Sequence, residues 1–351
     1  MALPETPVLL GFAIGAALGV VGLLSGFCLM SGLREWWNAD DGSKIRSYAV
    51  ALAVAIAGAQ LLAGFGLVEI GKSLYLLPSF SAPLIFAGGL LFGIGMVLAN
   101  GCASRALVLL GKGNLRSLVV LVIIGVAAQM TLKGLLAPAR LAIMQWTQVT
   151  PASVSVPALL SSIGIGDELA RIAATLTASG ALLLFAFSDR SFRRSTGQIA
   201  AGVAVGLLVT AGWLSTGWLG VDEFNPIPVT SLTFISPIAD TLQYVMLSTG
   251  LSLNFGIAVV LGVLTGSIAT ALLTGRFQVE GYSSASQMSR SILGAALMGA
   301  GGAMAYGCSV GQGLTGLSTL AIPSFIAVAG ILSGAALGLR GRVAMPALAA
   351  R

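Results

Sequence analysis

Apolar segments of about 20 residues recur along the whole chain and are separated by short polar stretches. A helix of this length crosses the hydrocarbon core of a bilayer and satisfies its own backbone hydrogen bonds within lipid. The strands of a transmembrane barrel would instead alternate polar and apolar residues, and these segments do not. The pattern predicts an all-α integral membrane protein with about nine transmembrane helices. These lie near residues 8–33, 47–67, 88–105, 115–136, 169–187, 197–218, 253–273, 294–311 and 320–339.

Two stretches interrupt this pattern. Residues 138–166 are apolar in patches but are broken by Pro151 and Pro157, so we expect short helices near the membrane surface. Residues 230–247 are rich in Thr and Ser and contain Pro237, which makes them too polar for a span that faces lipid. Because irregular backbone is tolerated at membrane depth where protein buries it, this stretch predicts a re-entrant segment.

Two of the predicted spans resemble each other. Each is an apolar, glycine-striped helix that ends in Gly-Cys, at Cys102 in the first and at Cys308 in the second. Self-similarity at long range indicates a duplicated unit, and paired glycine-interrupted segments in two halves of a transporter point to its central site. We therefore predict that these cysteines lie at the functional centre. The identical positions are Gly88/Gly294, Leu91/Leu297, Gly93/Gly299, Gly95/Gly301, Ala99/Ala305, Gly101/Gly307 and Cys102/Cys308.

The composition agrees with a membrane protein, because 56% of the residues are hydrophobic, only 9% are charged, and the mean hydropathy is +0.97. The net charge of +6 is spread over short loops, so it indicates membrane topology and not nucleic-acid binding. With the amino terminus outside, the inside loops carry most of the basic residues. These are Arg34, Lys44, Arg46, Arg105, Lys112, Arg116, Arg190, Arg193, Arg194, Arg276, Arg290, Arg340 and Arg342, whereas the outside loops keep mainly Glu5, Glu69, Asp167, Glu168, Asp222 and Glu223.

The same topology inverts the two halves relative to each other. The span near residues 169–187 adds one crossing, so the first Gly-Cys helix runs inward and the second runs outward. Inverted repeats bring their matched sites together near the midplane. We therefore divide the chain into a first repeat with a connecting surface segment (1–166), a linking transmembrane helix with a basic loop (167–196), and a second, inverted repeat (197–351) that ends in the cytoplasm.

The chain has three cysteines and no histidine. The absence of histidine excludes Ser-His triads, haem-histidine ligation and the usual zinc sites. A thiol in apolar surroundings stays protonated and acts as a weak S–H donor, which suits a polarisable sulfur anion. Cys28, which glycines bracket in the first span, also fits simple core packing. Cys102 and Cys308, matched across the duplication, indicate function instead.

The residues around the two Gly-Cys pairs suit an anion. Gly101 and Gly307 permit a sharp turn, and a helix that restarts at Ala103 or Ser309 would direct its free N–H groups toward the preceding cysteine. Arg105 would draw an anion to the inner mouth. Further neutral donors are Asn100, Ser104, Tyr306, Ser309 and Gln312.

Three other polar residues lie within apolar surroundings. An ionisable residue inside a membrane segment is a functional candidate, so Asp240 is either part of the site or a helix cap. Gln60 and Gln129 either bridge helices or line the path, and both interpretations stay open.

In these features the sequence resembles the YeeE/YedE sulfur-transport family, which includes bacterial thiosulfate uptake proteins. The resemblance covers most of the chain and rests on the helices Gly95 to Cys102 and Gly301 to Cys308, and on Ser-Gly-Phe-Cys at Cys28. It implies an hourglass-shaped inverted repeat in which thiosulfate passes the three cysteines by successive S–H···S contacts. It also implies a small cytoplasmic sulfur-carrier protein as a partner.

We therefore predict a multi-pass permease of the bacterial inner membrane that takes up thiosulfate and is neither an enzyme nor dependent on a cofactor or metal. Its other partner is the lipid bilayer. One alternative is a permease for a selenium compound, another sulfur species or an unrelated solute. Another is a membrane-bound sulfurtransferase that forms a cysteine persulfide, although the sequence offers no base beside the cysteines to activate them.

Overall fold

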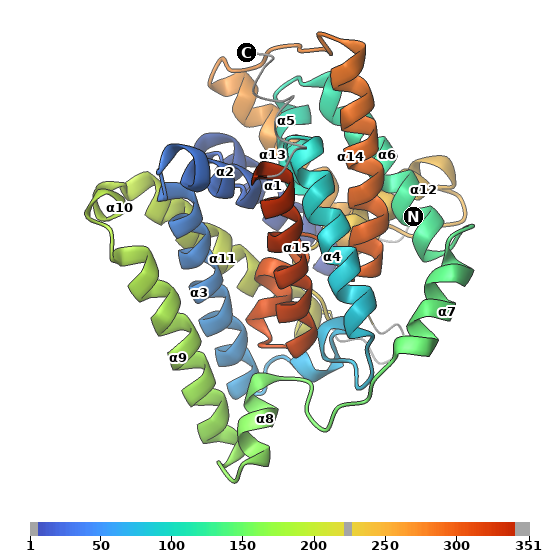
Figure 1. Ribbon diagram of the computed structural model, residues 1–351. Coiled ribbons are helices and arrows are strands. Elements are labelled where there is room, and N and C mark those ends of the chain that lie inside the picture. The colour runs from blue at the N-terminus through green and yellow to red at the C-terminus, as the bar shows by residue number, and fades with distance from the viewer. Residues whose placement is uncertain (1–5, 221–226, 341–351) are drawn as a thin grey trace.

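The computed structural model describes residues 6–220 and 227–340, and within these ranges every regular element is a helix (Figure 1). Eight helical stretches in the described residues are long and apolar enough to cross a membrane. The protein is therefore an all-α, multi-pass membrane protein, as predicted. The helices are α1 (Thr6–Ser25), α2 (Leu29–Ala39), α3 (Ser43–Gly64), α4 (Ala82–Leu98), α5 (Ala103–Gly111), α6 (Leu115–Leu132), α7 (Ala137–Thr147), α8 (Val156–Ser162), α9 (Asp167–Phe187), α10 (Arg190–Arg194), α11 (Thr196–Gly217), α12 (Ile235–Met246), α13 (Phe255–Leu273), α14 (Ala285–Met304) and α15 (Ile322–Arg340), with short turns η1 (Ile70–Lys72), η2 (Leu74–Leu76) and η3 (Gly311–Gly316).

The predicted span near residues 294–311 corresponds to α14, which is not among these eight because it is less apolar. It is 20 residues long, but its first turns carry Gln287 and Arg290. It nevertheless packs lengthwise between α4 and α6 (Figure 1). Its polar first turns suit a position at the membrane interface, where charged side chains reach water.

The crossing of α4 and α14 forms the centre of the fold, and glycines make it close. A Cβ atom built on Gly88 would lie 2.7 Å from the carbonyl oxygen of Gly301, and one built on Gly294 would lie 2.7 Å from that of Gly95. These are the positions that the sequence pairs, Gly88 with Gly294 and Gly95 with Gly301. The two contacts are thus reciprocal, as a two-fold relation between the helices requires.

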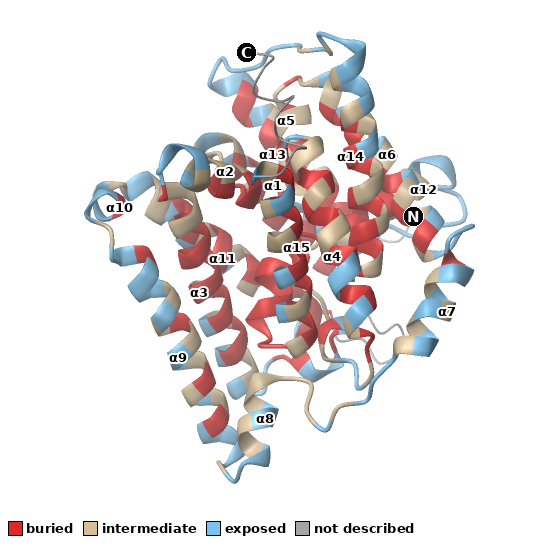
Figure 2. Ribbon diagram, viewed as in Figure 1, coloured by how far each residue is buried: buried red, intermediate tan, exposed pale blue. Residues whose placement is uncertain are grey.

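The other long helices pack around this pair. α15 lies against α4 and α6 against α14, while α1 packs on α13 and α3 on α11. Glycines also bring α1 and α13 together, because a Cβ atom on Gly15 would lie 2.3 Å from the carbonyl oxygen of Val259. α9 stands at the edge of the molecule, beside α3 (Figure 1). Buried residues accordingly concentrate in the middle, and α7, α8 and α9 are largely exposed (Figure 2).

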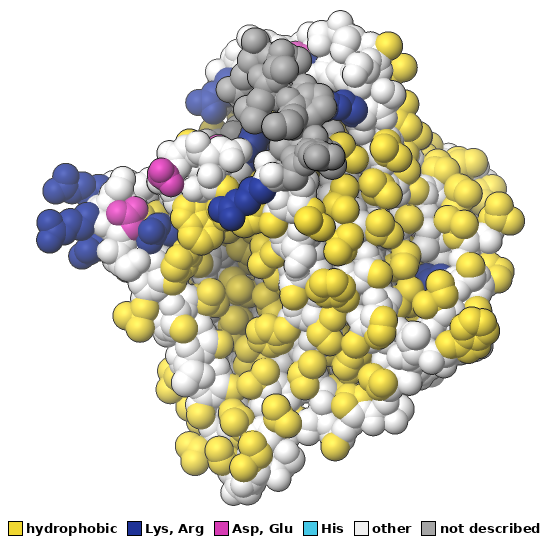
Figure 3. All heavy atoms as spheres, in the orientation of Figure 1, with side chains coloured by type: hydrophobic (Ala, Val, Ile, Leu, Met, Phe, Trp, Pro, Cys, Tyr) yellow, Lys and Arg dark blue, Asp and Glu magenta, His cyan; other side chains and the backbone are white. Residues whose placement is uncertain are grey.

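The surface divides as expected for a protein that spans a bilayer. Hydrophobic side chains cover most of the visible face, whereas Lys and Arg side chains gather toward one end (Figure 3). A group of basic side chains projects there at α10, which carries Arg190, Arg193 and Arg194. The positive-inside rule predicts that a basic end of this kind faces the cytoplasm.

The two interrupted stretches fold as short helices. Within residues 138–166, α8 buries no side chain and α7 buries only Ala137, which agrees with a position near the membrane surface. Within residues 230–247, α12 is 12 residues long and therefore too short to span a bilayer. It packs against α6, α13 and α14.

The division of the chain into two repeats and a linking segment stays a prediction, which the reciprocal glycine contacts support. The hourglass outline and the orientation in the membrane also stay predictions. Among the loop charges used to orient the chain, Glu5, Asp222, Glu223 and Arg342 lie outside the described residues.

Candidate functional site

Two interruptions of the helices bring Cys28 and Cys102 together. The segment between α1 and α2 turns at Gly26, whose φ of 67° is in the left-handed region, and Cys28 then forms the N-cap of α2. Cys102 forms the N-cap of α5. The two Sγ atoms are 3.9 Å apart, both thiols are free, and both side chains are buried. This distance is within the range of a hydrogen bond between sulfur atoms.

The turn before Cys102 differs from the predicted one. The left-handed residues are Asn100 (φ 58°) and Tyr306 (φ 56°), and Gly101 and Gly307 have no positive φ. The amide of Gly101 instead donates to the carbonyl of Met96 at 3.0 Å, which closes a Schellman turn with Asn100 at its left-handed position. Asparagine tolerates this conformation because its short polar side chain bonds locally. The prediction that the glycines make the turn was wrong.

Both glycines instead lie against a long side chain, closely at Gly307 and at ordinary contact distance at Gly101. A Cβ atom on Gly101 would lie 3.4 Å from Cγ of Arg105, and one on Gly307 would lie 3.2 Å from Cγ of Gln312. Both long side chains thus fold back over the residue before the cysteine.

The predicted restart of a helix was correct at Ala103, where α5 begins, but not at Ser309. The chain after Cys308 makes a turn and then the π-helical segment η3, in which the amide of Thr315 donates to the carbonyl of Val310 at 3.0 Å. Glycines allow side chains to approach this segment, since a Cβ atom on Gly313 would lie 2.2 Å from the Tyr48 hydroxyl. Single π-turns of this kind are frequent at functional sites.

Cys308 is fully buried, and two residues that follow it in the chain, Ser309 and Gln312, each carry a buried polar atom with no partner among the described residues. The amide of Gly311 donates to the Sγ atom of Cys308 at 3.3 Å. Within residues 6–220 and 227–340, neither Oγ of Ser309 nor Oε1 of Gln312 has a hydrogen-bond partner, although both side chains are buried. An unsatisfied buried polar group costs about 1–3 kcal/mol. These two atoms are therefore suited to a polar ligand that passes Cys308.

Tyr48 connects the Cys28–Cys102 pair with the segment after Cys308, and it was not among the residues predicted from the sequence. Its hydroxyl donates to the carbonyl of Ser309 at 2.5 Å, and its ring stacks on Phe27, next to Cys28, with centroids 5.6 Å apart. Tyr48 and the three cysteines belong to one buried cluster. The available signal was a hydroxyl within the apolar run of α3, where Ser47 and Gln60 are the other buried polar side chains.

Basic side chains surround the pair of thiols on the side of α2 and α5. Arg34 donates to Oδ1 of Asn100 at 2.5 Å, and a Cβ atom on Gly26 would lie 3.7 Å from the guanidinium of Arg105. Ser104 lies 3.3 Å from the Cys102 thiol. The structure thus brings the predicted Asn100, Ser104 and Arg105 to one place. It adds Arg34, which the sequence analysis used only as a topology signal.

Two predicted residues lie elsewhere. Tyr306 donates from its hydroxyl to Sδ of Met144 on α7 at 3.1 Å. Asp240 lies 3.8 Å from Nζ of Lys133 and accepts a hydrogen bond from Ser236 at 3.2 Å. The structure therefore groups Asp240 with polar residues of α6 and α12, away from the thiol contacts.

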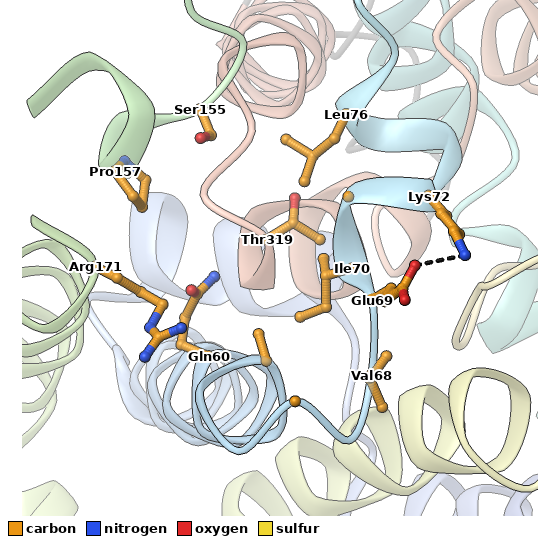
Figure 4. A pocket seen from close by; sticks show the side chains of 13 residues that line it. Gln60, Val68, Glu69, Ile70, Lys72, Leu76, Ser155, Pro157, Arg171 and Thr319 are labelled. Atoms are coloured by element: carbon orange, nitrogen blue, oxygen red, sulfur yellow. Dashed lines mark ion pairs between the residues drawn. The ribbon is translucent and has the colours of Figure 1, made fainter. Parts of the chain in front are cut away.

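A cavity of about 480 Å³ lies between the end of α3, the start of α9 and the loop before α15 (Figure 4). Arg171 and Gln60 face each other on one side of it, and Thr319 points into it. The ion pair between Lys72 and Glu69 lies on the opposite side. One wall of the cavity thus carries the guanidinium group of Arg171 and the amide group of Gln60.

The fold and this site together define a multi-pass membrane transport protein with a buried cluster of free thiols. The chain belongs to the sulphur transport family, whose family model matches residues 24–337. It is 26% identical over 321 residues to the thiosulfate transporter TsuA of Escherichia coli (strain K12), an alignment that covers 88% of this chain and 86% of the relative. It is 24% identical over 331 residues to the thiosulfate transporter TsuA of Spirochaeta thermophila, with 90% and 93% of the two chains covered.

Proposed function

We propose that this protein takes up thiosulfate, or a closely similar sulfur-containing anion, along a path lined by Cys28, Cys102 and Cys308. The observation that carries the proposal is the contact of 3.9 Å between two free, buried thiols at breaks in the membrane helices. The names of both relatives support the choice of substrate.

The chemistry of the site fits a sulfur anion. A neutral S–H group donates weakly to the terminal sulfur and leaves the ion free to move on, whereas a buried cation would hold a dianion tightly. The cations lie at one end of the site instead, where Arg34 and Arg105 flank the Cys28–Cys102 pair. An anion that passes the thiols therefore meets positive charge as it leaves the membrane interior.

The proposed location is the bacterial inner membrane, with the amino terminus outside and the carboxyl terminus in the cytoplasm. The basic residues of α10 and of the loops beside α2 and α5 support this orientation. On this basis Arg34 and Arg105 flank the inner mouth. We also propose, from the family resemblance, that a small cytoplasmic sulfur-carrier protein receives the sulfur compound there.

The protein is proposed to be a carrier and not a sulfurtransferase. A nucleophilic cysteine requires a base or a cation that stabilises the thiolate. In the described part of the chain, the hydrogen-bond partners of the thiols include another thiol, the Ser104 hydroxyl and the Gly311 amide, none of which is a base or a cation. Transient S–H···S contacts need no such activation.

Uptake of ³⁵S-labelled thiosulfate into cells that lack their other sulfur permeases tests the proposal. Expression of the protein is expected to produce saturable uptake that unlabelled thiosulfate suppresses and equimolar sulfate does not, because only thiosulfate offers a terminal sulfur to the thiols. Selenite and selenate serve as further competitors. Membrane-inserted protein without thiosulfate uptake would contradict the proposal, and a stable persulfide on a cysteine in mass spectra would favour the enzyme.

A further inference from the structure

The cavity beside Arg171 opens at the end of the molecule where α3 ends and α9 begins. In the proposed orientation this end faces outside. The cavity wall is completed by Ser155 and Pro157 at the start of α8, where the Val156 amide donates to the carbonyl of Leu320 at 3.0 Å. The cavity is therefore bounded by elements from distant parts of the chain and is close to the loop that leads back to Cys308.

Within the described residues, Arg171 is paired only with the exposed Glu168, whereas Lys72, the other basic side chain of the cavity, has a close counter-ion. Lys72 pairs with Glu69 at 2.5 Å, and both side chains point into water, with about 70% of each exposed. Arg171 is only 27% exposed, and its nearest acidic group, Glu168, lies 3.9 Å away on a side chain that is 82% exposed. Water screens an exposed carboxylate of this kind strongly, so the charge of Arg171 is poorly compensated.

The direction in which the Arg171 side chain points also favours a role in the cavity. The helix α9 exposes Leu169, Ile172 and Leu176 on its outer face, and an arginine that only anchored the helix would extend to the membrane surface on that side. Arg171 turns inward instead. A Cβ atom on Gly64 would lie 2.9 Å from Nη2 of Arg171, so a glycine at the end of α3 makes room for the guanidinium.

Polar groups lead from this cavity to Cys308. Nε2 of Gln60 donates to the carbonyl of Ser318 at 3.0 Å, and the Thr319 hydroxyl donates to the carbonyl of Gly316 at 2.7 Å. Gly316 ends η3 and lies against Gln312, since its Cβ would be 2.7 Å from Oε1 of that residue. Oε1 is the unpaired atom described above, and Gln312 follows Cys308 by one turn.

We propose that this cavity is the outer binding site for the substrate anion and that Arg171 binds it, an inference that rests on the proposed function. The planar guanidinium presents paired N–H donors that match two oxygens of a sulfonate group. Bound in this way, thiosulfate keeps its terminal sulfur free to approach the thiol of Cys308. Gln60 and Thr319 line the route between the two sites.

Kinetics of thiosulfate uptake by Arg171→Gln, Arg171→Lys and Arg193→Gln test this site. Arg171→Gln is expected to raise KM about tenfold, which corresponds to the loss of one charged hydrogen bond, while the maximal rate changes little. Arg171→Lys keeps the charge but loses the paired donors, so its KM should be intermediate. Arg193→Gln is the matched control and should leave KM unchanged, because Arg193 is exposed on α10, beyond the far end of α9 from Arg171 and its cavity.

Gly64→Ala provides a second variant in case Arg171→Gln does not insert into the membrane. It keeps the charge but displaces the guanidinium, and it should also raise KM. Unchanged KM in both Arg171→Gln and Gly64→Ala would overturn the inference while leaving thiosulfate uptake intact.

Thermal stabilisation of the purified protein by thiosulfate separates this inference from the proposed function. Thiosulfate should raise the melting temperature of wild type and of Arg193→Gln, but not that of Arg171→Gln at the same concentration. If wild-type cells take up no thiosulfate, the proposed function fails, and this measurement alone decides the inference. Equal stabilisation of wild type and Arg171→Gln, or stabilisation of neither, would overturn it.

Discussion

The Sγ atoms of Cys28 and Cys102 lie 3.9 Å apart although 74 positions separate the two residues in the chain. Each cysteine forms the N-cap of a helix that begins inside the protein, α2 for Cys28 and α5 for Cys102. Two breaks in different transmembrane helices therefore meet at one pair of thiols. This arrangement suits the pair to a transient contact with a sulfur anion during transport. It also makes the pair a site where oxidation would block the path.

Oxidation should block transport at this pair. A disulfide needs an S–S distance of about 2.05 Å, so a small movement joins the two thiols and removes both S–H donors. Treatment of proteoliposomes with diamide should form a Cys28–Cys102 disulfide and abolish thiosulfate uptake, and dithiothreitol should restore it. Peptide mapping identifies the bond, with Cys308 remaining free. Full cross-linking with undiminished uptake would contradict the proposed path.

Tyr48→Phe should impair uptake without preventing folding. The substitution removes the hydrogen bond to the Ser309 carbonyl and leaves that buried group unpaired, at a cost of about 1–3 kcal/mol. Uptake should fall roughly tenfold if this bond holds Ser309 in place for transport. Tyr282→Phe is the matched control, because the Tyr282 hydroxyl donates to the Arg116 carbonyl at 3.4 Å in a loop remote from the thiols. Equal uptake in the two variants would remove Tyr48 from the site.

The reciprocal contacts of α4 and α14 predict that Gly88→Ala and Gly294→Ala destabilise the protein to a similar extent. In each case the new methyl group would lie 2.7 Å from a backbone atom of the partner helix. Overpacking of this kind costs about 1–3 kcal/mol. Gly180→Ala is the control, since no atom lies within 4 Å of its Cβ position, and alanine favours the helix.

Thermal unfolding in detergent measures these three variants. A loss of stability in only one of the two central variants would argue against the two-fold relation and hence against the proposed division into inverted repeats.

Asp240→Asn should change uptake by less than about twofold. Its partner Lys133 is 65% exposed, and pairs of this kind contribute about 0–1 kcal/mol. Asp240 was a candidate from sequence because ionisable residues are rare within membranes. A large loss of uptake at normal abundance would return it to the functional site.

The transmembrane segments could be predicted from sequence because bilayer thickness sets the length of an apolar run. The end of the apolar helix shortly before Cys102 and the restart at Ala103 were also predictable, since a Gly-Cys motif at the end of an apolar helix is a local signal. The exact turn could not be predicted, because both Asn100 and Gly101 can adopt the left-handed conformation. Only the backbone geometry shows that Asn100 does so.

Contacts between distant segments could not be predicted from the sequence, for a different reason. The periodicity of one helix says which face is apolar, but not which helix covers it. The approach of Tyr48 to Ser309, of Arg34 to Asn100 and of Arg171 to Gly64 depends on how α2, α3 and α9 pack. The glycines of the π-helical segment after Cys308 likewise accommodate side chains from other elements, and these contacts also depend on packing.

The most direct test of the account is uptake of labelled thiosulfate by Cys102→Ala and Cys308→Ala, compared with wild type at equal abundance in the membrane. The account predicts that both variants fold, reach the membrane and lose uptake, because each removes one S–H donor from the path. Undiminished uptake in both would contradict it and would leave the three cysteines as core packing.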